Sequence, residues 1–152
     1  MGHGATSRGV SRRTLWAAVV LCVAAEMSGC TALSPYSATS YQQLTQLKAF
    51  HLMFIDDFTS EPTQPIDQAK LAAESSAGEL KFREAEEYSA GLKDTSRTYS
   101  IQVLHQMFEN NLAWLQKGNT YGKANAGEQK TVLQSAYDQA IQGETVRAGA
   151  SS

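Results

Sequence analysis

Residues 41–58, YQQLTQLKAFHLMFIDDF, decide the fold. Apolar side chains recur there at intervals of three and four residues, and at about 100° per residue they fall on one face of a helix. That face consists of Leu44, Leu47, His51, Phe54, Ile55 and Phe58. Thr39 or Ser40 can cap the start of the helix by accepting a backbone N–H. The stretch therefore predicts an amphipathic helix that buries one side against other helices.

A second helix is predicted from about Pro65 to Ala90, after a loop that contains the helix breaker Pro62. Its first half carries a stripe of small residues that would let a neighbouring helix approach closely: Ala69, Ala73, Ser76 and Ala77. Gly91 is expected to end this helix, because glycine is common just after a helix terminus.

A third helix is predicted from Asp94 or Thr95, one of which caps it, to Lys117, with Gly118 as its stop. Its main apolar face is Ile101, Leu104, Phe108, Leu112 and Leu115. A second apolar flank is formed by Tyr99, Val103, Met107 and Trp114. With two apolar sides, this helix is expected to be the most buried of the set.

A fourth helix is predicted from Glu128 to Ile141, with one apolar side made by Val132, Leu133, Ala136, Tyr137, Ala140 and Ile141. Residues 143–152 are expected to form a disordered tail. The chain lacks the period-2 alternation and the hairpin turns that indicate strands. The expected fold is therefore all-α, an antiparallel bundle of about four helices over residues 41–142.

The first 30 residues have the order of a targeting segment. A basic start with Arg8, Arg12 and Arg13 precedes an apolar run of 11 residues, 15–25, which is too short to span a bilayer. Glu26 follows this run, and the next four residues are Met27, Ser28, Gly29 and Cys30. Met-Ser-Gly-Cys resembles the lipobox at which bacterial lipoproteins are cleaved and acylated. The paired arginines also resemble a twin-arginine export signal, so the general and the twin-arginine export routes both stay open.

The resemblance implies that residues 1–29 are a signal peptide that is removed and that Cys30 carries lipid, including palmitate. Residues 30–40, rich in Ser, Thr and Ala, would then be a flexible lipidated tether. In the lipoproteins that the motif resembles, an acidic residue after the cysteine often means retention in the inner membrane. Thr31 is not acidic, so the resemblance implies the periplasmic face of the outer membrane, with the inner membrane as the alternative. The mature part resembles small helical lipoproteins.

The composition of the chain limits the classes of partner that it is expected to bind. Removal of residues 1–29 would leave 123 residues with a net charge of −4, and this mild acidity argues against nucleic acid as a partner. Cys22 would leave with the signal peptide and Cys30 would be acylated, so no disulfide is expected. The predicted partners are the membrane, through the lipid on Cys30, and a protein of the cell envelope.

Five side chains are candidates for a ligand site or a buried polar cluster: His51, Glu84, Glu87, His105 and Glu109. His51 lies in the middle of an apolar face, where a buried imidazole needs hydrogen-bond partners. His105 and Glu109 are four residues apart and can meet on a helix surface. Glu84 and Glu87 would point inward if they continued the small-residue stripe, and into solvent if the helix turned them outward.

No motif of a zinc protease, a di-iron bundle, covalent haem or an α/β-hydrolase nucleophile occurs in the sequence. We therefore expect no enzyme, no cofactor and no resident metal.

The first hypothesis for the function is a lipid-anchored, non-enzymatic interaction or accessory module, which predicts an apolar or aromatic patch left open between helices. The alternatives are a bundle that binds a small ligand or metal through the five candidates, and an immunity or inhibitor protein against a secreted toxin or lysozyme.

Overall fold

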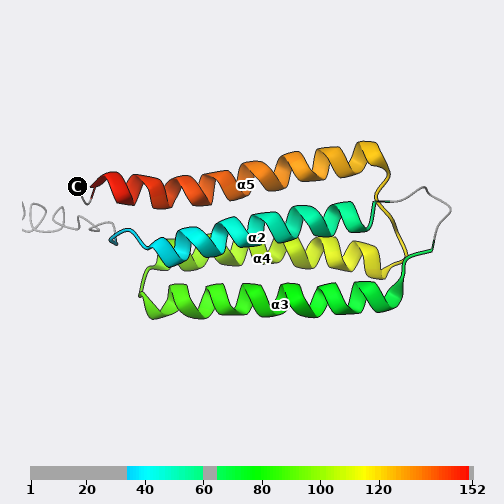
Figure 1. The fold of residues 1–152 in the computed structure, drawn as a ribbon, viewed down its shortest axis with the longest axis horizontal. Helices are drawn as coiled ribbons and strands as arrows, with labels where there is room; N and C mark the ends of the chain where they lie inside the picture. Colours follow the sequence, from blue (N-terminus) through cyan, green and yellow to red (C-terminus); the bar gives the residue numbers. More distant parts are fainter. Residues whose placement is uncertain (1–33, 60–64, 151–152) are drawn as a thin grey trace, which may run out of the picture. The chain divides into compact units, whose positions relative to one another are not determined.

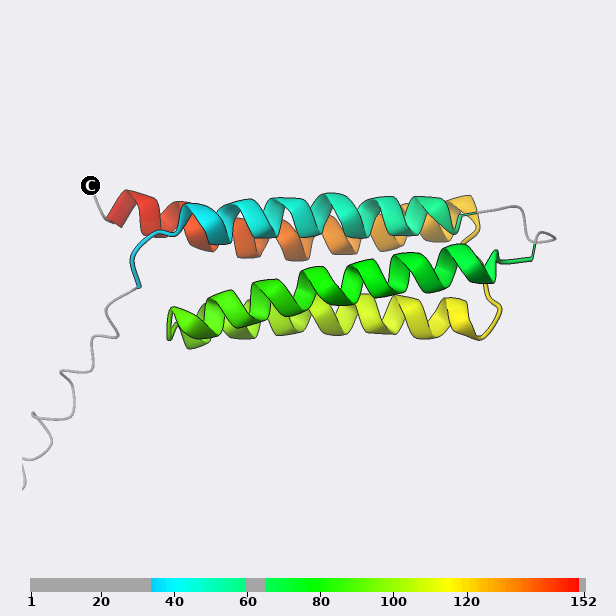
Figure 2. The same ribbon diagram turned by 60° about the horizontal axis from the view of Figure 1, so that its bottom comes forward.

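The computed structural model describes residues 34–59 and 65–150. The predicted signal peptide, the cleavage-site residues 27–29 and Cys30 lie outside this part of the chain. Within it are four α-helices, in the order α2 (Ala38–Asp57), α3 (Gln68–Gly91), α4 (Thr95–Gln116) and α5 (Lys123–Ala150). Figures 1 and 2 show the four helices side by side, which confirms the predicted four-helix bundle.

Neighbouring helices run in opposite directions. At one end of the bundle, the hydroxyls of Ser37, before α2, and Tyr88, late in α3, lie 3.0 Å apart. At the other end, the Tyr121 N–H between α4 and α5 donates to the carbonyl of Phe58, just after α2, over 3.2 Å. The start of α2 thus lies beside the end of α3, and the end of α2 beside the start of α5. The interface between α2 and α5 is the most extensive, and that between α4 and α5 is much smaller.

Side-chain caps fix where three helices begin. Ser37 accepts the Ser40 N–H, Asp67 accepts from the first turn of α3, and Asp94 accepts the Arg97 N–H. The Asp94 cap was predicted, whereas the predicted cap at Thr39 or Ser40 is wrong because α2 already begins at Ala38, so that both residues lie in its first turn. Helix α2 therefore begins within the expected tether of residues 30–40, and Ser40 is buried.

The core confirms the predicted faces of two helices. All six residues of the expected α2 face are buried, as are Ile101, Leu104, Phe108 and Leu115 on α4. The second flank of α4 is not buried: Tyr99 is 68% exposed and Trp114 47%. The expectation that this helix is the most buried is therefore wrong, because α5 packs against α4 over only a small interface.

Helix α3 buries a different face from the one predicted. The small-residue stripe, Ala69, Ala73, Ser76 and Ala77, is exposed to solvent. The buried positions are Leu71, Gly78, Phe82, Ala85 and Ser89. At Gly78 the helix approaches the core most closely: a Cβ there would lie 2.9 Å from Phe50 Cε1 and closer still to the ring of Phe108.

The expected disordered tail is also wrong for residues 143–150. Helix α5 begins at Lys123 instead of Glu128 and continues to Ala150. Glu144 and Arg147, within the expected tail, are buried and paired with α4. Those ion pairs give the last turns of α5 the tertiary contacts that a free tail lacks.

Gly78→Ala tests the close approach of α3 to the core. We expect a loss of roughly 1–3 kcal/mol of unfolding free energy, because the added methyl has to displace buried aromatic rings. The matched control is Gly127→Ala in α5, where a Cβ meets nothing within 4 Å. Alanine is the better helix former there and should raise stability by about 0.5–1 kcal/mol. Urea unfolding of both variants measures the difference, and changes of the same sign would contradict the packing described.

Candidate functional site

The five candidate residues do not form one cluster. His51 is fully buried in the core. Of the two orientations that the sequence left open for Glu84 and Glu87, the structure has the solvent-exposed one, so neither shares the buried position of His51. His105 and Glu109 do lie together, on the side of α4 that faces α3. The ring of Phe82 contacts both histidines, with centroid distances of 6.3 Å to His51 and 4.7 Å to His105.

His51 belongs to a chain of hydrogen bonds through the core, which we call the His51 chain: Tyr121, Asn111, His51 and Tyr137. Tyr121 Oη donates to Asn111 Oδ1 over 2.9 Å. The Asn111 amide lies 3.0 Å from His51 Nε2, and His51 Nδ1 lies 3.1 Å from Tyr137 Oη. An amide nitrogen only donates, so Nε2 accepts and Nδ1 carries the proton that is donated to Tyr137. Both ring nitrogens are thus satisfied, as a structural core histidine requires.

Burial sets the charge state of this chain. It lowers the pKa of His51 to about 4 and raises the pKa of Tyr121 to about 12. The pKa of Tyr137 is raised as well, for the same reason. At neutral pH all three groups are uncharged, which is the form that a low-dielectric interior favours.

The second polar group in the interior is an ion cluster of Asp94, Arg97, Glu144 and Arg147. Arg97 binds both carboxylate oxygens of Glu144, with Nε 2.6 Å from Oε1 and Nη2 2.9 Å from Oε2. Asp94 Oδ2 lies 3.1 Å from Arg97 Nη1 and 3.3 Å from Arg147 Nη2. Two cations and two anions make the cluster neutral, and the hydrogen bond with Glu144 raises the pKa of Arg97.

The ion cluster also holds the segment that precedes α2. Arg97 Nη2 donates to the Pro35 carbonyl over 2.6 Å, and the Ser37 N–H donates to Glu144 Oε2 over 3.4 Å. Removal of one partner from a buried pair leaves an uncompensated charge, at a typical cost of about 3–5 kcal/mol. The start of α2, the start of α4 and the end of α5 are thereby tied together.

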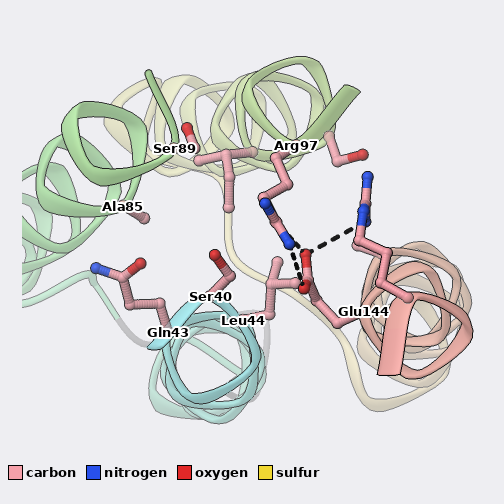
Figure 3. A pocket seen from close by; sticks show the side chains of 11 residues that line it. Ser40, Gln43, Leu44, Ala85, Ser89, Arg97 and Glu144 are labelled. Atoms are coloured by element: carbon pink, nitrogen blue, oxygen red, sulfur yellow. Dashed lines mark hydrogen bonds and ion pairs between the residues drawn. The ribbon is translucent and has the colours of Figure 1, made fainter. Parts of the chain in front are cut away.

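A small cavity lies beside this cluster (Figure 3). Its walls include Ser40 and Leu44 of α2, Ala85 and Ser89 of α3, and Arg97 with Glu144. Its volume of about 20 Å³ is close to that of a single water molecule. The Ser40 hydroxyl, which lines it, has no hydrogen-bond partner among the described residues. The cavity is too small for an organic ligand, so it does not provide the predicted ligand site.

Two open hollows of about 310 and 490 Å³ follow each other along the boundary between α4 and α5, and we call them together the α4–α5 groove. The exposed second flank of α4 forms one wall, with Tyr99 and Val103 in the first hollow and Met107 and Trp114 in the second. The α5 wall of the first hollow consists mainly of small side chains: Ala136, Ala140 and Gly143. The sequence-based expectation of an aromatic patch left open between helices describes this α4–α5 groove.

The opposite side of α4 carries the His105 cluster: Glu79, Glu86, His105 and Glu109. His105 Nδ1 lies 2.8 Å from Glu86 Oε1, and Nε2 lies 3.1 Å from Glu79 Oε2. Burial alone would lower the pKa of His105, but the hydrogen bonds to Glu86 and Glu79 raise it overall. The ring is stacked on Phe82 with an interplanar angle of 4°, which fixes its orientation.

No protein-family model matches the chain, and comparison with curated proteins and with solved structures gives no match either. Among the described helices, none combines the length and the hydropathy needed to cross a bilayer. The fold is a four-helix bundle whose apolar core contains two polar groups, the His51 chain and the ion cluster, and which has an open groove on one side.

Sequence reasoning missed most of the polar interior, although a signal was present. Arg97 and Asn111 continue the three- and four-residue spacing of the apolar face of α4, and Glu144 and Arg147 continue that of α5. Polar residues at core positions of a helix indicate partners on a neighbouring helix. Glu79 and Glu86 carry a weaker signal, because their link to His105 crosses from α3 to α4.

The two described histidines should act on stability in opposite directions. His51 has a lowered pKa in the fold, so it stabilises the protein above about pH 6.5. As the pH falls from 6.5 to 4, protonation of His51 in the unfolded chain should lower the free energy of unfolding by up to about 3 kcal/mol. His105 has a raised pKa, so its contribution is present below 6.5 and is lost as the pH rises through the folded value.

Urea unfolding between pH 4 and 8 separates these contributions. His51→Gln should flatten the loss of stability on acidification, whatever its effect at neutral pH. His105→Gln should make the loss steeper, because the favourable contribution at low pH disappears. Profiles of the same shape for wild type and His51→Gln would contradict the buried neutral imidazole.

Proposed function

We propose that this protein is a lipid-anchored accessory module of the bacterial cell envelope that binds a partner protein through the α4–α5 groove and has no enzymatic activity. The observation that carries the proposal is the exposure of large apolar side chains along that groove. Tyr99, Val103 and Trp114 are 68%, 40% and 47% exposed and follow one side of α4. An apolar surface of this kind is typical of an interaction site.

The walls of the groove favour an apolar and largely uncharged occupant. Apart from aromatic and aliphatic groups, the hollows are lined mainly by amides: Asn110, Asn111, Asn125, Gln129 and Gln139. Glu128 is a charged side chain at the rim of the larger hollow, and Arg147, in the smaller one, is engaged in the ion cluster. An occupant with an apolar stripe and short polar flanks fits this lining.

The shape favours an α-helix as the occupant. From Ser96 to Trp114 the groove follows α4 for about 27 Å, or roughly five turns at 1.5 Å per residue. In the first hollow, the small side chains of α5 leave space for side chains from an incoming helix. The proposed partner is therefore an envelope protein that presents an amphipathic helix, bound in the helix-in-groove mode.

The anchor is proposed from the sequence. Met27-Ser28-Gly29-Cys30 supports cleavage before Cys30 and acylation of its sulfur, and Thr31 supports the periplasmic face of the outer membrane. Two or more acyl chains, at about 0.8 kcal/mol per buried CH₂, hold a protein stably in a bilayer.

Cys30→Ser tests the anchor. Wild-type protein should fractionate with the outer membrane, and its amino-terminal peptide should begin at an acylated Cys30 in mass spectrometry. The Cys30→Ser variant should lose the lipid and retain residues 1–29, because acylation precedes cleavage in the lipoprotein class that the motif resembles. An unmodified thiol with an intact amino terminus in wild-type protein would overturn the anchor and leave the groove untouched.

The groove is tested in cells with a photo-crosslinking amino acid at Tyr99, and at Leu80 on α3 as control. Leu80 is also an exposed apolar residue, at 52%, but lies outside the groove. We expect one crosslinked protein from the Tyr99 position and none from Leu80. Val103→Glu should abolish the crosslink, and Leu80→Glu should leave it unchanged, since only the first places a charge in the groove.

Three outcomes would contradict this assignment. Crosslinking from both positions would indicate non-specific contact. A product made of two copies of this chain would indicate self-association instead of a partner. Persistence of the crosslink in the Val103→Glu variant, with the fold shown intact by circular dichroism, would place the interface elsewhere.

A further inference from the structure

A set of metal-ligating side chains lies on the side of α4 opposite the groove. Glu79 of α3 and His105 with Glu109 of α4 each offer one ligand atom, and these three atoms lie within 4.8 Å of one another. Helix α4 positions two of them because residues four apart lie one above the other on a helix. Glu79 is brought to them by the packing of α3 on α4.

The distances suit a single small cation. Glu79 Oε2 and His105 Nε2 are 3.1 Å apart. Two ligands of a tetrahedral ion at about 2.0–2.1 Å are about 3.3 Å apart, so both atoms can reach one ion with little movement. Glu109 is exposed and held by a hydrogen bond of 2.9 Å from Gln106 Nε2 to its Oε2. Its other oxygen is left for the ion.

His105 is oriented as a metal ligand requires. Glu86 lies 2.8 Å from Nδ1 and can accept the proton there, so that Nε2 presents its lone pair to an ion once that ion displaces the proton shared with Glu79. A carboxylate behind a ligating histidine is the usual second partner in zinc sites, where it fixes the tautomer and raises the basicity of the imidazole. The buried ring of Phe82, stacked on His105, prevents rotation of the imidazole.

The charge of the His105 cluster also favours a bound cation. The cluster contains three carboxylates, and a protonated His105 would supply one positive charge. A divalent ion on Nε2 replaces that single proton with two positive charges and so neutralises the cluster more fully. The balance of the step is simple: the ion binds, one proton leaves Nε2 when the imidazole was protonated, and no oxidation takes place.

We infer that Glu79, His105 and Glu109 bind one divalent transition-metal ion of the zinc class, with Glu86 as the outer partner of His105. One imidazole with two carboxylates suits zinc better than calcium or magnesium, which prefer oxygen ligands alone. Three protein ligands leave a fourth position for water or for a group from another molecule. The site is independent of the proposed groove, because it involves the other side of α4.

Sequence motifs do not reveal this site, because a metal-binding motif consists of ligands that lie close together along one segment of the chain. Here the ligands come from two helices, and the sequence-based pair of His105 and Glu109 supplies only two of them. Glu84 and Glu87, the other acidic candidates, are exposed on α3 and are not among its ligands.

Titration of the full chain, purified in detergent without a histidine tag, tests the site. Zinc should bind with a Kd of about 10 µM or tighter in isothermal titration calorimetry, and cobalt should give visible absorption bands of a four- or five-coordinate ion. His105→Gln should abolish both signals. Glu79→Gln, Glu109→Gln and Glu86→Gln should each weaken zinc binding by about 10–100-fold.

Glu84→Gln and Glu87→Gln are the matched controls, since each removes an exposed carboxylate of α3 that is not a member of the His105 cluster. They should leave the Kd within about twofold of wild type. The inference is overturned if wild type binds no zinc, if the cluster variants bind as tightly as wild type, or if the controls weaken binding as much. Thermal unfolding of each variant in chelator confirms that the fold is retained. Crosslinking from Tyr99 should not depend on any of these changes.

Discussion

Phe108 of α4 occupies the centre of the bundle because α3 has no side chain at Gly78, the point where the two helices face each other. Around this ring lie four others: Phe50, His51, Phe54 and Phe82. Three helices therefore meet on one aromatic side chain. The fourth helix, α5, reaches the same centre through Tyr137, which hydrogen-bonds to His51. A larger residue at position 78 would force the rings apart, and the positions of all four helices depend on that contact.

Periodicity was sufficient to predict the fold class, the apolar face of α2 and most of the main face of α4. The residue types at the helix ends predicted the Asp94 cap and the stop at Gly118, which has a left-handed φ of 80°. It was insufficient for α3. Alanine and serine are compatible with both core and solvent, so the small-residue stripe gave no reliable direction. The true face follows Leu71, Phe82 and Ala85, with a glycine among them. Glycine contributes nothing to an apolar pattern, although here it is the closest contact that the helix makes.

The polar interior was harder to predict than the apolar one, for a physical reason. Charged residues are normally exposed, and the cost of burying them is offset only by partners that a single helix does not reveal. Arg97 and Glu144 are 47 residues apart, and Asn111 and His51 are 60 apart. His51 was correctly singled out because it interrupts an apolar face, but its role is that of a core hydrogen-bonding group. The His105 cluster was half recognised, since two of its four members share a helix.

The most extensive interface in this fold joins its first described helix to its last. A ribosome completes α5 roughly 90 residues after α2, which at 5–20 residues per second is a delay of several seconds. For most of that interval Tyr137, Glu144 and Arg147 have not yet been made, so His51, and later Arg97, lack their partners from α5. The most extensive interface can therefore form only after α5 has been synthesised, so the core closes last at the contact between the first and the last described helix.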